Sequence, residues 1–187
     1  MTGKAKFLAG LLGILATAAF TGCDDDTQPA VEYQTQGFIK GKLTGVSKED
    51  NSYIFNEDFI YTQYSILFGR VATYKINSDG SYSIQISRAN FALFGEAKIA
   101  FDLDTVVDTT PKNIALEFSY TKELPDTYIT FSMMSDSENT STITDLTFDS
   151  GSGRFTGKFT LTGAVNSTEK NAAVTGEFDV IAKRSIE

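Results

Sequence analysis

The amino-acid sequence predicts an all-β protein, with a single antiparallel sandwich or barrel-like domain of about 8–10 strands after a signal peptide and a short tether. Three observations predict this class. Apolar and polar residues alternate with a period of two, Gly, Asn and Asp separate the alternating runs, and no long segment has the 3.6-residue period of a helix. Because each predicted strand has one apolar and one polar face, we expect an antiparallel sheet with one packed and one wet face. The sandwich is favoured over the barrel.

Residues 1–22 have the layout of an export signal. Two lysines precede an uncharged apolar run of 14 residues, 7–20, and the small residues Thr21 and Gly22 follow it. As a helix this run would be about 21 Å long, which is short of the roughly 30 Å hydrocarbon core of a bilayer. We therefore expect a cleaved signal peptide rather than a membrane-spanning helix.

The residues Phe20-Thr21-Gly22-Cys23 resemble the lipobox of bacterial lipoproteins, with phenylalanine where that family usually has leucine. The resemblance implies cleavage before Cys23, a diacylglyceryl group on its thiol, and acylation of the new amine, such as by palmitate. Cys23 is the only cysteine, so it has no partner for an internal disulfide. Two or more acyl chains anchor a protein stably. Residues 23–36 are therefore expected to be the lipidated cysteine that holds the protein at the membrane, followed by an acidic, polar tether.

The acidic run Asp24–Asp26 also resembles a sorting signal. It is similar to the acidic tract after the cysteine in surface-exposed lipoproteins of the Bacteroidota, and the whole chain has the style of their uncharacterised β-rich lipoproteins. This resemblance implies the outer membrane or the cell surface. In other Gram-negative bacteria an aspartate at this place resembles an inner-membrane retention signal, so the periplasmic face of the inner membrane is the alternative. No functional residue other than Cys23 is carried over.

The charge balance excludes one class of partner. The whole chain has a net charge of −8, and loss of the two signal lysines leaves about −10. Such a surface repels nucleic acid and anionic lipid head groups. The expected partner is a membrane, held through the lipid anchor and not by charge, and a protein or glycan partner is left open.

The remaining residues, 37–187, are expected to be the β domain, and its elements follow from the alternation. The runs predicted as strands are 72–76, 82–86, 97–103, 114–120, 129–133, 143–148, 155–161 and 174–180. Asn77–Gly80 is a turn signal that predicts a hairpin between the first two. The run 143–148 is weaker, because Leu146 and Phe148 are out of phase with Ile143.

Two stretches allow more than one interpretation, namely 47–67 and 89–96. Within the second, Asn90–Phe94 is compatible with a strand start or with one helical turn.

The residue inventory predicts no catalytic residue, no cofactor and no metal site. The chain has no histidine, which excludes Ser-His-Asp and Cys-His catalysis and histidine-ligated metals. No glycine-rich phosphate loop of a common pattern is present.

Three groups of residues are nevertheless weighed as sites. Asp102 and Asp104, on one face of a strand, with Asp108 in the next loop, are the carboxylates that a glycosidase would need, although a solvated acidic face is the preferred interpretation. The oxygen-rich loop 136–139 is a candidate for calcium, whereas 149–153 is better explained as a turn. The third group consists of Tyr53, Tyr61 and Tyr64, which could line a groove for glycan or peptide.

Three functions remain compatible with these residues. The preferred one is a non-catalytic interaction or structural module on a membrane-anchored lipoprotein. The alternatives are a lipocalin-like carrier of a small apolar ligand and a carboxylate-dependent carbohydrate-active enzyme. The enzyme needs two acids in a cleft and the carrier needs an internal void. A filled core without an acidic cleft would therefore favour the non-catalytic module.

Overall fold

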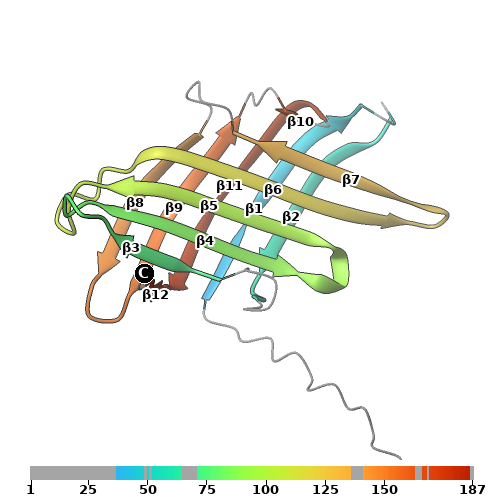
Figure 1. Ribbon diagram of the computed structural model, residues 1–187. Coiled ribbons are helices and arrows are strands. Elements are labelled where there is room, and N and C mark those ends of the chain that lie inside the picture. The colour runs from blue at the N-terminus through green and yellow to red at the C-terminus, as the bar shows by residue number, and fades with distance from the viewer. Residues whose placement is uncertain are drawn as a thin grey trace, which may run out of the picture. The chain divides into compact units, whose positions relative to one another are not determined.

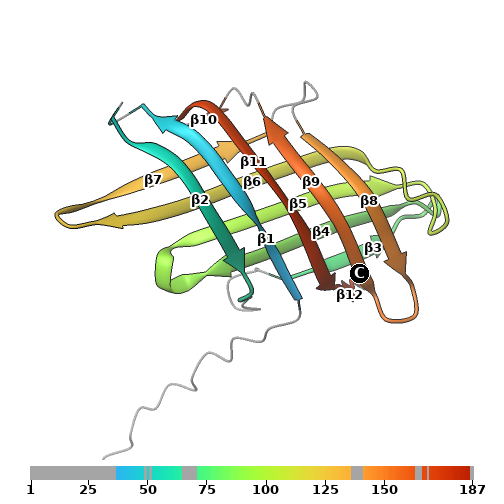
Figure 2. The same ribbon diagram turned by 180° about the vertical axis from the view of Figure 1, so that it is seen from behind.

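The computed structural model describes residues 37–48, 50, 52–64, 71–135, 141–162, 166–167 and 169–185. These residues form two β-sheets that pack face to face as a sandwich (Figure 1), and the same arrangement is seen from behind in Figure 2. The all-β class is confirmed, and the sheets are not closed into a barrel. The described residues contain twelve strands, of which β10 and β12 have two residues each, so the expected number of 8–10 holds for the longer strands.

The first sheet has five strands in the order β2-β1-β11-β9-β8, and all its neighbours are antiparallel. Its strands are β1 Gly37–Ser47, β2 Ile54–Tyr61, β8 Ser141–Asp149, β9 Arg154–Thr162 and β11 Glu169–Ile181. The second sheet has the order β10-β7-β6-β5-β4-β3-β12, and only β12 and β3 are parallel. Its strands are β3 Thr73–Ile76, β4 Tyr82–Asn90, β5 Gly95–Leu103, β6 Lys112–Leu124, β7 Thr127–Met134, β10 Asn166–Ser167 and β12 Lys183–Arg184.

Every run predicted as a strand lies in one, except that Ala72 precedes β3, and the predicted hairpin joins β3 to β4. Its turn is closed by a hydrogen bond from the Gly80 amide to the Asn77 carbonyl (3.0 Å), with Gly80 at φ 86°. The ambiguous stretch near residue 90 contains a 3-10 turn, Phe91–Leu93, and the ambiguous stretch 47–67 contains β2. Among the described residues no helix has the length and apolar character needed to cross a membrane. The signal segment, Cys23 and the tether lie outside the described residues.

The phase slip in the run 143–148 is a β-bulge in β8. The register with β9 shifts between Thr144 and Thr147, and Asp145 within the shift has φ 52°. Two more bulges have an asparagine at positive φ at the register shift, Asn113 in β6 and Asn171 in β11. Asn and Asp tolerate the left-handed conformation better than other residues with a side chain, so each bulge has a residue type suited to its backbone.

Aromatic rings from both sheets fill the space between them. Phe118 of β6 lies between Phe59 of β2 and Phe159 of β9, with ring centroids 5.8 Å and 5.2 Å away. In the same layer Phe101 of β5 meets Phe155 of β9 at 6.2 Å. All five side chains are almost completely buried, so the core is a packed aromatic layer.

Candidate functional site

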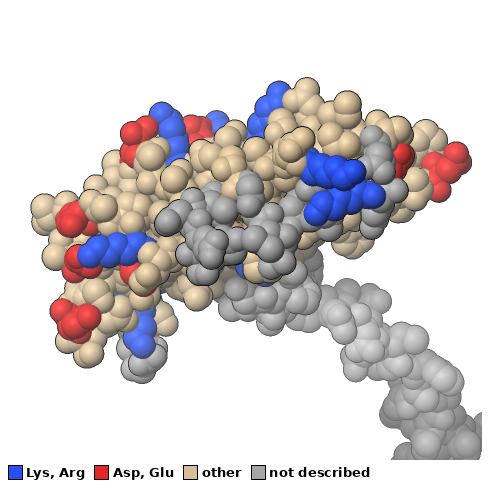
Figure 3. All heavy atoms as spheres, turned by 90° about the horizontal axis from the view of Figure 1, so that it is seen from above, with Lys and Arg blue, Asp and Glu red and all other residues tan. Residues whose placement is uncertain are grey.

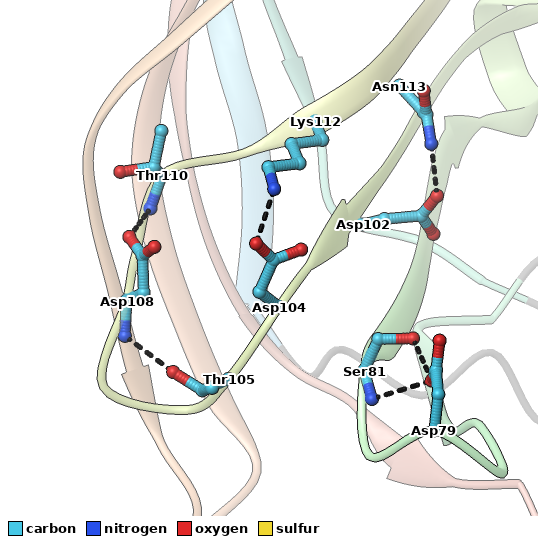
Figure 4. A network of polar contacts seen from close by, with 9 residues as sticks. All are labelled: Asp79, Ser81, Asp102, Asp104, Thr105, Asp108, Thr110, Lys112 and Asn113. Atoms are coloured by element: carbon cyan, nitrogen blue, oxygen red, sulfur yellow. Dashed lines mark hydrogen bonds and ion pairs between the residues drawn. The ribbon is translucent and has the colours of Figure 1, made fainter.

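The acidic residues weighed as catalytic each serve a local turn or strand pair (Figure 4). Asp102 accepts a hydrogen bond from the side-chain amide nitrogen of Asn113 at 2.8 Å, and Asp104 forms an ion pair with Lys112. Asp108 accepts from the Thr110 backbone amide at 3.0 Å, and hydrogen bonds from the Thr110 side chain, first, and from this amide lower the pKa of Asp108.

In Figure 4 the three carboxylates point to these partners and not to one another. These local, exposed contacts lie at the β5–β6 connection and do not bring the three carboxylates together.

The calcium candidate 136–139 lies outside the described residues. The segment 149–153 is the turn that was expected: a carboxylate oxygen of Asp149 accepts from the Gly151 amide at 2.9 Å, and Gly153 has φ 72°. Nowhere in the part of the chain that the structure describes do three or more Asp, Glu, His or Cys side chains form a group that could hold a metal ion.

The three tyrosines do not line a groove, so that hypothesis is wrong. Tyr61 is 2% exposed and Tyr64 is 4% exposed, while Tyr53 is partly buried against the core. The hydroxyl of Tyr61 donates to the carbonyl of Ser119 at 2.7 Å, which connects β2 of one sheet to β6 of the other. These side chains belong to the interior of the sandwich.

A buried arginine is the clearest feature that sequence reasoning missed. Arg88 of β4 is 1% exposed and follows Ile84 and Ile86 on the inner face of the strand. Its guanidinium lies 5.0 Å from the centre of the Tyr64 ring and donates to the carbonyl of Ser87 at 2.7 Å. Burial lowers the pKa of Arg88 to about 10, so it remains a cation at neutral pH. Extending the period-two pattern by one step would have placed it inside.

A second polar cluster joins the two sheets beside the aromatic layer. Glu57 of β2 accepts from the Tyr53 hydroxyl at 3.1 Å and from the Lys122 ammonium at 3.0 Å. This hydrogen bond and the charge of Glu57 raise the pKa of Lys122, and burial raises the pKa of the neighbouring Tyr120. With a single carboxylate, the cluster has no acid–base pair of the glycosidase type, and it connects the sheets through an ion pair.

The outer face of the second sheet has a shallow hollow of about 410 Å³. Its floor includes Ala100 and Ala115, which are cross-strand neighbours with small side chains. Beside them the Lys98 ammonium lies 3.2 Å from Glu117 and 3.8 Å from Glu96. Both carboxylates are therefore ion-paired to one lysine on an open surface, an arrangement better suited to hydrogen-bonding a polar ligand than to proton transfer.

The outer face of the first sheet has another open hollow, of about 590 Å³. It lies over Gly41 and Gly176, and Lys40 pairs with Glu177 at its edge at 2.9 Å. Lys158, also in its lining, pairs with Asp145 at 2.8 Å. Cations and anions thus alternate here, and on the face seen in Figure 3 they are likewise interspersed, without an extended basic surface.

Comparisons with protein-family models, curated proteins and solved structures find no match to this chain.

The buried tyrosine between the sheets predicts a fall of stability at alkaline pH. Burial raises the pKa of Tyr61 above its ordinary value of 10.0, so the folded protein keeps the phenol neutral while the unfolded chain ionises near pH 10. The stability that this difference contributes is complete below about pH 10 and is lost as pH rises above it, by about 1.4 kcal/mol per pH unit.

Urea unfolding between about pH 8 and pH 11 measures this loss. Tyr61→Phe is expected to lose about 1 kcal/mol at the lower pH, because the bond to Ser119 disappears, and to show a shallower fall above it. Tyr128→Phe, which alters a phenol on a 63% exposed side chain, is the control and should keep the slope of the natural protein. Equal slopes for all three proteins would contradict the assignment to Tyr61.

Proposed function

We propose that the chain is a lipid-anchored, non-catalytic binding module, displayed at the outer membrane or cell surface. The observation that carries the proposal is that both hollows are open depressions on outer sheet faces, made by ion-paired and small side chains. The weighed acids that the structure describes make local contacts in a turn or between paired strands, and aromatic rings occupy the space between the sheets. These features favour a surface that contacts a partner over a catalytic cleft or an enclosed carrier site.

The membrane half of the proposal rests on Cys23 and the segment before it. The sequence before this thiol is of the lipobox type, which supports lipid attachment. No second cysteine is present, so the thiol has no partner for an internal disulfide. Two or three acyl chains would hold the β domain at the bilayer through a short acidic tether, because each buried methylene contributes about 0.8 kcal/mol.

Replacement of this cysteine tests the anchor. We expect Cys23→Ser to move the protein from the membrane fraction to the soluble fraction almost completely, because no acyl chain can be attached. Intact-mass analysis of the natural protein should show loss of residues 1–22 and the added mass of the lipid. Phe20→Leu, which restores the usual lipobox residue, is the matched control and should remain in the membrane fraction. A Cys23→Ser protein that fractionates like the natural one, or an unmodified thiol with the leader attached, would contradict the proposal.

The non-catalytic half is tested on the outer hollow of the second sheet. Assays with a panel of chromogenic glycosides should show no hydrolysis above background, and Glu117→Gln should change nothing. Hydrolysis by the natural protein that Glu117→Gln abolishes would instead assign a carboxylate-dependent enzyme.

A further inference from the structure

The turn between β4 and β5 is apolar and exposed at the same time. Residues 91–94, Phe-Ala-Leu-Phe, comprise the 3-10 turn and the residue that follows it, and they contain no charge. We call them the apolar tip. Phe94 is 79% exposed and Ala92 is also exposed. A large aromatic side chain at the end of a hairpin, surrounded by water, contributes little to packing and suggests a contact surface.

The backbone of the apolar tip is fixed by side chains that satisfy its amides. The side-chain oxygen of Asn90 accepts from the Ala92 amide at 3.1 Å, and that of Gln63 accepts from the Phe91 amide at 3.0 Å. Phe94 itself has φ 49° and ψ 35°, in the left-handed region that a bulky residue rarely adopts. The fold therefore maintains a strained backbone conformation in which this ring stays exposed. Strained backbone conformations are found preferentially at functional sites.

Tyr61 connects the base of the apolar tip with the part of β1 where the described chain begins. Tyr61 pairs in the sheet with Ile39, two residues after Gly37, and the same Tyr61 ring lies against Gly95 at the base of the tip. A Cβ added to Gly95 would be 2.6 Å from the Tyr61 hydroxyl oxygen. Figures 1 and 2 both show the start of β1 and the β4–β5 turn toward the lower side of the domain.

The length of chain between Cys23 and Gly37 limits how far the apolar tip can be from the bilayer. Residues 23–36 extend to about 50 Å at most, which lets the lower side of the domain come into contact with a bilayer that holds Cys23. The end of β11, which pairs with the start of β1, is followed by the exposed cations Lys183 and Arg184. They locally offset the acidic charge of the domain and can contact lipid phosphates there.

We propose that the apolar tip inserts into the head-group region of the leaflet that holds the acyl chains of Cys23. This inference rests on the proposed lipid anchor. Phe94 enters the boundary between head groups and acyl chains, where an aromatic ring leaves water without leaving the interface. The anchor keeps the tip at a high local concentration near the bilayer, so one or two apolar side chains are enough to orient the domain.

The test uses the lipidated mature protein, residues 23–187, carrying Ala92→Cys. If the Cys23 thiol is acylated, the new thiol is the only free one and takes a single environment-sensitive fluorophore. In phosphatidylethanolamine–phosphatidylglycerol vesicles we expect a blue-shifted emission that is quenched by lipids spin-labelled near the head group. Val107→Cys is the matched control, because Val107 is 88% exposed in the connection that follows β5, at the strand end opposite the tip. Its emission should remain that of a dye in water. Adding Phe94→Ser to Ala92→Cys should lower the quenching several-fold.

The outcomes separate the tip from the anchor. A protein that sediments with vesicles while the label at position 92 behaves like the label at position 107 overturns insertion of the tip and leaves the anchor standing. A label at 92 that is shielded from water but not quenched by lipid shows that a protein covers the tip, and this also overturns the proposal. A protein that does not sediment with vesicles overturns the anchor and, with it, the inference for the tip.

Discussion

Gly176→Ala is expected to destabilise the fold by about 3 kcal/mol, because the interior beside this glycine has no room for a methyl group. Gly176 of β11 is the cross-strand partner of Gly41 in β1. A Cβ at Gly176 would lie 2.2 Å from the Lys40 carbonyl oxygen and 2.7 Å from the tip of the Phe159 ring. A side chain here would have to separate two central strands or displace a ring of the aromatic layer, and neither is a flexible surface group.

Urea unfolding of the purified mature protein measures this change. Gly151→Ala is the matched control, because its added Cβ would meet only one atom, the Asp149 carboxylate oxygen at 3.3 Å, in an exposed turn. The control should stay within about 0.5 kcal/mol of the natural protein. If Gly176→Ala also changed stability by so little, the close approach of β1, β11 and Phe159 would be wrong.

The sequence predicted the sheets better than it predicted the surface. Period-two alternation depends on burial of one strand face, so it identified the strand segments that contribute the longest apolar runs, such as β5 and β9. It missed β1, because Gly41 interrupts the apolar face between Ile39 and Leu43. Close packing against β11 requires this glycine, and hydropathy does not reveal it.

Individual side chains in the interior and on the surface were harder to place. A lone arginine in an alternating run reads as a surface residue, yet Arg88 lies inside because its cation contacts the Tyr64 ring and a backbone carbonyl. The pair Glu96 and Glu117 was missed as well, since the two residues are distant in sequence and only the pairing of β5 with β6 brings both to Lys98. The bulge in β8, by contrast, is visible in the sequence as a break in the period-two alternation.

Phe118→Ala is expected to cost about 3–5 kcal/mol and to create a cavity between the sheets. The Phe118 side chain is 2% exposed and is the ring of the second sheet that stacks on Phe159 at 5.2 Å and approaches Phe59 at 5.8 Å. The substitution removes the contacts of this ring with β2 and β9 of the opposite sheet at once. Tyr128→Ala, on a side chain that is 63% exposed, should cost less than about 0.5 kcal/mol in the same urea titration.

Benzene binding to Phe118→Ala and to the natural protein also distinguishes the binding-module proposal from the carrier alternative. An empty apolar cavity the size of a phenyl ring binds small aromatic molecules such as benzene, which raises the melting temperature of the variant. The natural protein, whose rings occupy that space, should show no such rise in saturating benzene. If benzene or a fatty acid stabilised the natural protein as strongly as the variant, an enclosed ligand site would exist already, and the lipocalin-like carrier would replace the surface-binding module as the proposed function.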